Sequence, residues 1–307
     1  MSEEWPAPQL IDDLELEGSK DKSRVLKDLL AGTTGGIAQV LVGQPFDTAK
    51  VRLQTSTRVT SVSEVVRNLI KNEGFMAFYK GTLTPLFGVG ACVSIQFGVN
   101  EAMKRMFHSL NTDSLSTLSL QQYYTCGLAG GIANSFLAAP IEHVRIRLQT
   151  QTQTGTGASA LYKGPIDCIK KLRSQGGLMR GLIPTLLREG HGCGTYFLVY
   201  EALVASDMNK GLDRKNIPAW KLCGYGAIAG TALWSVVYPV DVIKSVMQTD
   251  NLKSPKYGKS MRLVAKNLFI QGGIRAYFKG FTPTMMRAAP ANGATFATFE
   301  LAMRFLN

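Results

Sequence analysis

One short pattern occurs three times in this chain at nearly constant spacing. PFDTAKVRLQ starts at Pro45, PIEHVRIRLQ at Pro140 and PVDVIKSVMQ at Pro239. Each copy has a proline, an acid two residues later, a base three residues after the acid, and a glutamine nine residues after the proline. A second pattern follows each copy, and it ends in a base and a glycine, at Gly81, Gly181 and Gly280. The chain therefore consists of three copies of one unit of roughly 100 residues.

The repeats divide the 307 residues into a short tail and three units. We assign 1–23 to an acidic N-terminal tail and 24–112, 113–212 and 213–307 to repeats one, two and three. The tail holds seven acids and two bases, which fits neither a secretory signal nor an Arg-rich transit peptide. We therefore expect any organelle address to lie inside the chain.

Composition excludes several classes of protein. Apolar residues make up 45% of the chain and charged residues only 18%, which is too apolar for a disordered protein. The bases, which give a net charge of +12, punctuate apolar runs and do not cluster with aromatics as in a nucleic-acid-binding scaffold. The five cysteines stand far apart, and we expect small buried apolar residues and no metal site. With three histidines and no repeated nucleophile–base pair, we expect no catalytic residues and no enzyme.

Each repeat contains two apolar segments of membrane-spanning length, rich in Gly, Ala, Ser and Thr. A shorter amphipathic segment connects the two. We expect spans at 24–53, 82–107, 118–149, 182–206, 218–248 and 281–305, and connecting helices at 60–72, 163–174 and 257–270. Six crossings return both termini to one face of the membrane, with the connecting helices on the other. A soluble helical repeat protein is the alternative, and uninterrupted apolar runs at the same phase of every repeat argue against it.

The threefold P-x-[DE]-x-x-[KR] pattern, followed by an aromatic-basic-Gly pattern, resembles the mitochondrial carrier family. The resemblance runs from about Lys22 to Asn307. Within the family the chain looks most similar to the amino-acid and acylcarnitine branch, and there to the fungal Ymc carriers. The resemblance implies an all-α membrane protein, with six transmembrane helices in a threefold pseudosymmetric barrel and three short matrix helices. It also implies the mitochondrial inner membrane, with both termini toward the intermembrane space, and transport by antiport and alternating access.

The repeated acid and base lie three residues apart and so share one face of a helix. The preceding proline bends the helix and turns that end inward. The acid of one repeat can then pair with the base of the next and so form a ring of salt bridges. Because these salt bridges are partly solvent-accessible, they are weak enough to open. Ordinary pairs on a solvated helix face are the alternative. The predicted matrix gate consists of Asp47, Lys50, Glu142, Arg145, Asp241 and Lys244, braced by Gln54, Gln149 and Gln248.

The opposite end carries a less regular set of charges. Acids occupy equivalent points on the second spans, two of them after an aromatic residue, but a base follows only one of them. We therefore expect a weaker cytoplasmic gate, with solvated glutamates as the alternative. Its predicted members are Glu101, Lys104, Tyr200, Glu201, Phe299 and Glu300.

The substrate site is expected where the repeats differ. Seven residues past each motif glycine stand Gly88, Arg188 and Arg287, and Glu189 follows Arg188. At about 1.5 Å per residue these positions lie roughly 10 Å into the span. Arginine can hold a carboxylate and Glu189 an ammonium, while Gly88 leaves room for a side chain. A static ion cluster is the alternative. Gln96, His191, Asn134, Ser135 and Trp234 are further cavity candidates, with helix packing as their alternative.

This pattern of charges suits a small zwitterionic or carboxylate substrate. We expect an amino acid (glutamate, glycine or a similar small or basic amino acid), with carnitine or acylcarnitine as the alternative. We expect no cofactor apart from structural cardiolipin, no nucleic-acid partner, and a monomer. The resemblance places cardiolipin where free helix amides meet a base. The candidate lipid contacts are Gly74, Lys80, Gly81, Gly177, Arg180, Gly181, Gly273, Lys279 and Gly280.

Overall fold

The computed structural model describes residues 22–56, 61–110, 118–151, 161–211, 214–252, 254–258 and 260–306. Nearly all of the predicted acidic tail lies outside this part of the chain. Within these ranges the secondary structure is helical, and no strand is present. This is the all-helical architecture that the sequence predicts.

Six long helices, two from each repeat, form the body of the molecule. They are α2 (Lys22–Thr55), α4 (Leu83–Leu110), α5 (Leu120–Thr150), α7 (Leu182–Met208), α8 (Ala219–Thr249) and α10 (Phe281–Leu306). The shortest has 26 residues. At about 1.5 Å per residue each helix is longer than the roughly 30 Å hydrocarbon core of a bilayer.

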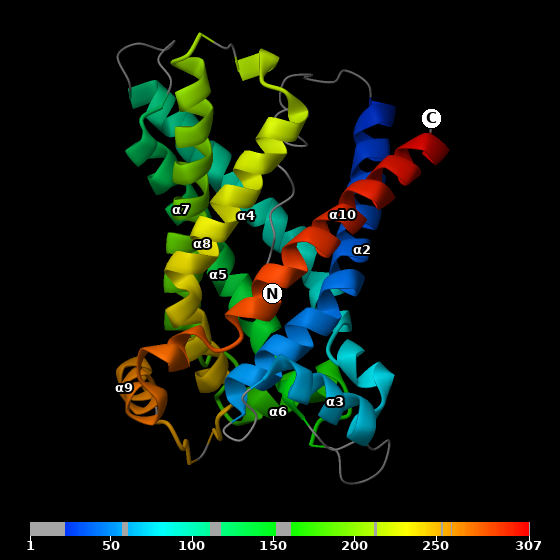
Figure 1. Ribbon diagram of the computed structural model, residues 1–307, viewed down its shortest axis with the longest axis vertical. Helices are drawn as coiled ribbons and strands as arrows, with labels where there is room; N and C mark the ends of the chain where they lie inside the picture. The colour runs from blue at the N-terminus through cyan, green and yellow to red at the C-terminus, as the bar shows by residue number, and fades with distance from the viewer. Residues whose placement is uncertain are drawn as a thin grey trace.

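Three shorter helices, α3 (Val62–Glu73), α6 (Pro165–Ser174) and α9 (Met261–Gly272), lie together at one end of the molecule (Figure 1). We call this the short-helix end. Serine caps start two of them, since Ser61 and Ser260 accept the amides of Glu64 and Leu263. A proline in the first turn starts α6. Three 3-10 turns complete the described chain: η1 (Phe75–Tyr79), η2 (Arg214–Asn216) and η3 (Gly273–Phe278).

The long helices pack in two groups. α5 packs along both α4 and α7, and α7 packs along α8, while α10 packs along α2. The pairs α2–α4 and α8–α10 meet over only short stretches. Figure 1 shows the result: α2 and α10 run together and diverge from the other four helices toward the end where the C-terminus lies.

Glycines bring α5 and α7 into backbone contact. A Cβ added at Gly131 would lie 2.3 Å from the carbonyl oxygen of Glu189, and one at Gly127 would lie 2.6 Å from that of Cys193. Small residues allow this approach, which is the typical way for helices to pack in lipid. The contact fixes the position of Glu189 relative to α5.

The first long helix of each repeat continues through its motif proline, at Pro45, Pro140 and Pro239. Figure 1 shows α2 turning toward the centre of the molecule in its lower half. The segments after the prolines are largely buried, including their charged residues. The bend predicted from the prolines thus places those charges inside the molecule.

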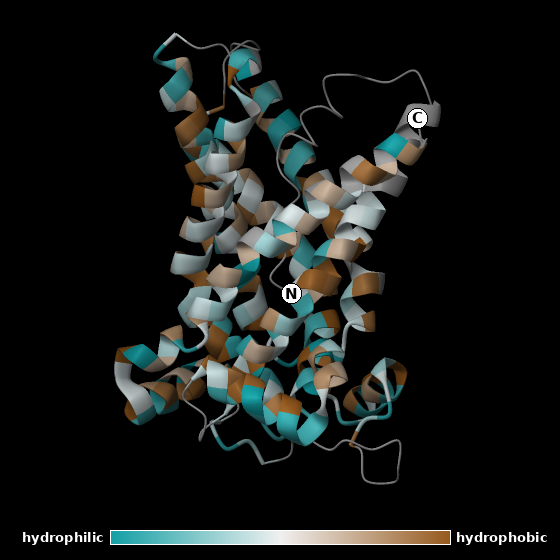
Figure 2. Ribbon diagram, turned by 45° about the vertical axis from the view of Figure 1, so that its right-hand side comes forward, coloured by the Kyte–Doolittle hydropathy of each residue, from teal (hydrophilic) through white to brown (hydrophobic). Residues whose placement is uncertain are grey.

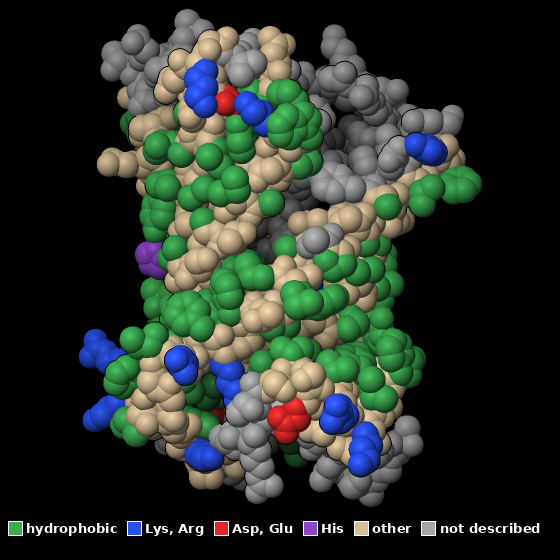
Figure 3. Space-filling view, viewed as in Figure 1, with side chains coloured by type: hydrophobic (Ala, Val, Ile, Leu, Met, Phe, Trp, Pro, Cys, Tyr) green, Lys and Arg blue, Asp and Glu red, His purple; other side chains and the backbone are tan. Residues whose placement is uncertain are grey.

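Apolar side chains cover the middle of the molecule, and Lys and Arg gather toward its two ends on the face shown in Figure 3. Figure 2 shows the same trend in the ribbon, with hydrophilic residues frequent near the short helices. By length and composition, the segment Trp220–Thr249 is apolar enough to cross a membrane, with a mean hydropathy of 1.4 over an 18-residue window. Phe75–Leu86 and Gly90–Leu110, which meet at 48°, would together form a second such span. Gly, Thr and buried charges lower the hydropathy of the other long helices. That all six predicted spans cross the membrane therefore stays a prediction.

Candidate functional site

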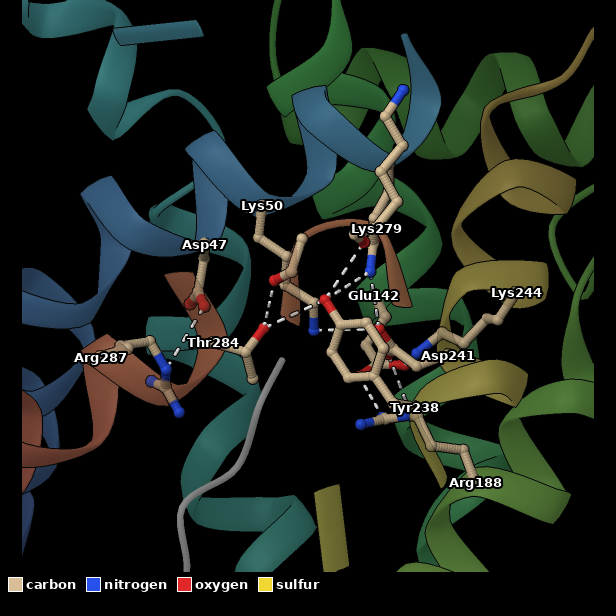
Figure 4. Close-up of polar contacts among 12 residues, drawn as sticks. Asp47, Lys50, Glu142, Arg188, Tyr238, Asp241, Lys244, Lys279, Thr284 and Arg287 are labelled. Atoms are coloured by element: carbon tan, nitrogen blue, oxygen red, sulfur yellow. Dashed lines mark hydrogen bonds and ion pairs between the residues drawn. The ribbon is translucent and has the colours of Figure 1, made fainter. Parts of the chain in front are cut away.

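Six buried charged residues form three ion pairs near the short-helix end. Each pair joins the acid of one repeat to the base of the next, and Figure 4 shows several of these side chains converging. The pairs are Asp47 with Arg145 at 2.7 Å, Asp241 with Lys50 at 3.0 Å, and Glu142 with Lys244. We call this set the ion-pair ring. Because α2, α5 and α8 each contribute one acid and one base, the ring ties all three repeats together.

Burial makes these pairs obligatory partners. The most exposed of the six residues, Asp47, retains 8% of its accessible surface, and Glu142 retains none. A buried charge without a partner is strongly destabilising, so removing one member of a pair leaves the other charge buried at a high free-energy cost. The ring therefore holds the three helices together only while every charge keeps a partner or finds a new one.

The three predicted bracing glutamines differ in what they contact. Gln54 donates to Asp241 Oδ2 and to Tyr238 Oη, at 3.2 Å each. Gln149 donates to Thr48 Oγ1 at 3.5 Å, and Gln248 to the carbonyl of Arg180 at 3.3 Å. Among the contacts of the described residues, Gln54 is thus the one of these three glutamines that hydrogen-bonds to an acid of the ion-pair ring.

A glutamine that the sequence analysis missed also braces the ring. Gln44, directly before Pro45, accepts Arg145 Nη2 at 2.6 Å and donates to the carbonyl of Lys80 at 3.0 Å. In repeat three the equivalent residue is Tyr238, whose hydroxyl donates to the carbonyl of Lys279 at 3.3 Å. In repeat two it is Ala139. The position differs in type between repeats, so no repeated motif pointed to it.

Two of the predicted substrate residues contact the ring directly. Arg188 Nη2 lies 2.5 Å from Glu142 Oε1 and also pairs with Glu189, and Arg188 Nε lies 3.9 Å from Asp241 Oδ1. Arg287 Nε lies 3.5 Å from Asp47 Oδ1. Figure 4 shows Arg287 beside Asp47, apart from Arg188. The ion-pair ring together with Arg188, Glu189 and Arg287 contains five bases and four acids. When all nine are ionised, the cluster has a surplus of one positive charge.

A small pocket opens between α7 and α8 beside this cluster. Arg188 and Glu189 supply its charges, and the rest of its wall is apolar or small: Gly192, Cys193, Leu233, Trp234 and Val237. Arg287 does not belong to this wall. A guanidinium and a carboxylate side by side can bind the two ends of a zwitterion.

Three other predicted substrate residues serve packing in this structure. A Cβ on Gly88 would lie 2.7 Å from Ile141 Cδ1, so the Ile141 side chain of α5 packs against Gly88. Gln96 is buried between helices, where it donates to Cys193 Sγ at 2.9 Å and accepts from Asn134 at 3.2 Å. His191 is exposed and hydrogen-bonded to the Tyr124 hydroxyl at 2.6 Å, outside the pocket wall.

At the other end, the predicted gate residues make local contacts. Glu101 pairs with Lys104 on the same helix at 2.6 Å, and Glu201 pairs with Arg214 of η2 at 2.9 Å. Tyr200 is buried and stacks on Tyr196. The side chains of Phe299 and Glu300 lie outside the described residues. Among those described, no closed ring exists at this end.

A cluster next to this end escaped the sequence analysis. Asp207 accepts Lys221 Nζ at 2.7 Å and the Tyr225 hydroxyl at 2.5 Å, which ties the end of α7 to the start of α8. Asp207 aligns with Phe107 and Leu306 in the other repeats, so the repeat pattern gave no signal for this cluster.

The three motif bases proposed as lipid contacts follow one structural rule. Each donates to a backbone carbonyl just after the first long helix of the next repeat: Lys80 to Gln151 at 3.4 Å, Arg180 to Asn251 at 2.8 Å, and Lys279 to Ser56 at 2.5 Å. Burial lowers the pKa of Lys279. These bases therefore link neighbouring repeats.

The glycines of the same motifs shape turns. The φ angles of Gly74, Gly81, Gly181, Gly273 and Gly280 lie between 58° and 90°. Such angles strain residues that carry a Cβ. A Cβ on Gly177 would lie 2.8 Å from Leu252 Cδ2, so this glycine is required for packing.

Repeat one has an additional acid at this end. Glu73 accepts both terminal nitrogens of Arg52 and also Lys80 Nζ, at 2.5 Å. Burial alone would raise the pKa of Glu73, but the hydrogen bonds from Arg52 and Lys80 outweigh burial and lower it. Arg52 also donates to the carbonyl of Gln149, which is in repeat two, at 2.9 Å.

Neither a metal site nor a disulfide is present in the described ranges. No group of three His, Cys, Asp or Glu residues there could hold a metal ion. All five cysteines lie in these ranges as thiols outside any disulfide, four of them buried and Cys223 exposed.

Comparisons with known proteins agree with this architecture. The family model described as "Mitochondrial carrier protein" matches residues 21–111, 116–209 and 215–307. The chain is 73% identical to the mitochondrial glycine transporter YMC1 of Saccharomyces cerevisiae, over the full length of both. It is 61% identical to the carrier protein YMC2 of the same yeast, over 100% of this chain and 99% of that one. It is 50% identical to the glutamate/glycine mitochondrial carrier ymc1 of Schizosaccharomyces pombe, over 91% of this chain and 94% of that one. The chain is therefore a transporter and not an enzyme, and it belongs to the mitochondrial carrier family.

Proposed function

We propose that this carrier moves a small amino acid, with glycine and glutamate as first candidates, across the inner mitochondrial membrane by alternating access. Two of the relatives are named for glycine or for glutamate and glycine. Those names support an amino acid over acylcarnitine, the alternative that the sequence left open. The pocket supports the same substrate class, because Arg188 offers a carboxylate partner and Glu189 an ammonium partner.

We propose that all six long helices cross the membrane as a threefold barrel. Their lengths and the close glycine-mediated packing of α5 on α7 support this. Buried charges are tolerated in such a barrel when they are paired or face a water-filled cavity. The short-helix end then faces the matrix, and both termini face the intermembrane space. One chain completes the ring, which supports a monomer as the working unit.

In this proposal the ion-pair ring is the matrix gate, and the structure represents a state closed there. The observation that carries the proposal is the direct contact between Arg188 and Glu142, since it joins the pocket to the ring. A substrate carboxylate on Arg188 competes with Glu142, so binding removes one of the two cations that Glu142 contacts. Glu142 then has Lys244 as the remaining cation of the two, so one ion pair fewer opposes the opening of the gate.

The opposite gate is the weaker one in this proposal. Glu101 and Glu201 pair locally with Lys104 and Arg214. Closing this end requires those glutamates to exchange local partners for partners on other repeats. The Glu101–Lys104 pair is half-buried and local to one helix, so the exchange gives up a single contact within α4.

We also propose that cardiolipin binds at the short-helix end. The motif bases are already engaged between repeats, so the phosphate would meet mainly backbone amides at the glycine turns beside Gly74, Gly181 and Gly273. Purified carrier in detergent should show a higher Tm with cardiolipin than with phosphatidylcholine at the same molar ratio. An identical Tm with both lipids would reject lipid binding there.

The decisive experiment is a substrate panel on purified carrier in liposomes. Radiolabelled glycine, glutamate, arginine and acetylcarnitine are offered outside, with each of them or buffer inside. We expect rapid uptake of at least one amino acid and faster uptake when an amino acid is inside, as antiport requires. Uptake of acetylcarnitine without any of the amino acids would overturn the proposed substrate class.

A further inference from the structure

Trp234 lies where the pocket and the ion-pair ring meet. Its indole forms part of the pocket wall together with Arg188 and Glu189. The side chain is 95% buried, since 5% of its surface is accessible, and it packs edge-on against Tyr238. The Trp234 indole is therefore in reach both of a ligand in the pocket and of residues in the ion-pair ring.

The ion-pair ring places a cation on this indole. Lys50 Nζ lies 4.5 Å from the centre of the Trp234 ring and 5.5 Å from that of Tyr238, while it pairs with Asp241 at 3.0 Å. Ammonium groups are attracted to the faces of aromatic rings, and to tryptophan most strongly. Lys50 thus depends on one carboxylate and two aromatic rings.

The junction that Lys50 holds lacks one support that the other two have. In repeats one and two an arginine, Arg52 or Arg147, donates to a backbone carbonyl in the next repeat. The equivalent residue in repeat three is Val246, which has no donor. At the junction of repeats three and one, Lys50 and Gln54 hold Asp241 from repeat one instead.

We propose that Trp234 is a specificity-determining residue that recognises the substrate's ammonium and couples its binding to the Lys50–Asp241 pair. The inference rests on the proposed amino-acid transport. A substrate held by Arg188 through its carboxylate places its ammonium between Glu189 and the indole. Two cations on one indole repel each other, so Lys50 is displaced and the junction of repeats three and one loosens. A substrate without an ammonium leaves Lys50 in place.

The test compares glycine with glycolate, which has a hydroxyl in place of the ammonium, for purified carrier in liposomes. The variants are Trp234→Leu, which removes the π face, and Trp234→Phe, which keeps a weaker one. Trp220→Leu is the matched control, because Trp220 stands on the same helix and is 74% exposed. The readouts are kcat and KM for each substrate, and detergent Tm reports folding.

We expect Trp234→Leu to lower the glycine-to-glycolate ratio of kcat/KM by at least about tenfold, and Trp234→Phe to restore part of it. Trp220→Leu should keep the wild-type ratio. A purely structural role would reduce both substrates equally, so an unchanged ratio in a folded Trp234→Leu variant overturns the inference. If the wild-type protein moves no amino acid, the proposed function fails instead. If Trp234→Leu does not fold, the ratio measured for Trp234→Phe decides, and a wild-type value there rejects the inference.

Discussion

Arg188 on α7 and Glu142 on α5 share an ion pair of 2.5 Å, so one guanidinium belongs both to the pocket and to the ring that closes the short-helix end. The same Arg188 nitrogen also pairs with Glu189. Substrate binding and gate closure therefore compete for a single cation. This shared residue is the physical basis of the transport cycle that we propose.

Replacing Arg188 should abolish transport. Arg188→Ala leaves Glu142 with one cation fewer and removes the carboxylate partner in the pocket. Removing one member of a buried pair costs about 3–5 kcal/mol, so we expect glycine uptake into liposomes to fall by at least about 100-fold. The control is Lys171→Ala, because Lys171 pairs with Asp167 on the exposed side of α6. Near-normal uptake by a folded Arg188→Ala carrier would remove Arg188 from the site.

Reversing one charge of a ring pair should abolish transport, and reversing both charges of the same pair should restore part of it. Lys50→Asp and Asp241→Lys each place two like charges about 3 Å apart in a buried site, and we expect uptake at background level. The double variant recreates an opposite pair and should recover a measurable fraction of the wild-type rate. Initial uptake rates in liposomes decide the question. A double variant no more active than either single one would mean that these residues do not act as a pair.

Adding one methyl group at Gly131 should separate α5 from α7. A Cβ there would lie 2.3 Å from the carbonyl oxygen of Glu189, which cannot move without shifting α7. We expect Gly131→Ala to lower the free energy of unfolding by about 1–3 kcal/mol and to reduce uptake, because Glu189 shifts with its backbone. Gly230→Ala on α8 is the control, since nothing lies within 4 Å of its added Cβ. Equal Tm values for the two variants would contradict the close contact.

Glu73 should make stability depend on acid pH. Its pKa is lowered in the folded protein, because bonds from Arg52 and Lys80 outweigh burial. Its contribution is therefore present above its ordinary pKa of 4.5 and is lost as the pH falls through the lowered folded value. Allowing for solvent screening, we expect Glu73→Gln to cost about 1 kcal/mol at pH 7. Tm curves of the two proteins should converge as the pH falls below the lowered pKa of Glu73, and a gap independent of pH would reject the assignment.

The repeat pattern predicted the helices well, because their signals are local. A helix continues through an apolar segment until turn residues end it, and Gly81, Gly181 and Gly280 mark the starts of α4, α7 and α10. The spacing of acid and base in each motif also fixed which charges share a helix face. These features need no knowledge of neighbouring helices.

The contacts of single residues depended on the neighbours instead. Gly88 was expected to give room to a substrate, but Ile141 of α5 occupies that space. His191 was a cavity candidate, but its side chain is exposed and bonds to Tyr124. In both cases the contact is made by a side chain of α5, Ile141 or Tyr124, which the repeat pattern did not identify.

By itself, the sequence determined three repeats, their proline-linked charges, and the depth at which Arg188, Glu189 and Arg287 break the symmetry. Only the tertiary structure decided that Arg188 reaches Glu142, that Lys50 rests on Trp234, and that Lys80, Arg180 and Lys279 link neighbouring repeats. The physical reason is range. Helix periodicity is set by residues three or four positions apart, whereas these contacts join residues that are far apart in sequence and meet only when the helices pack.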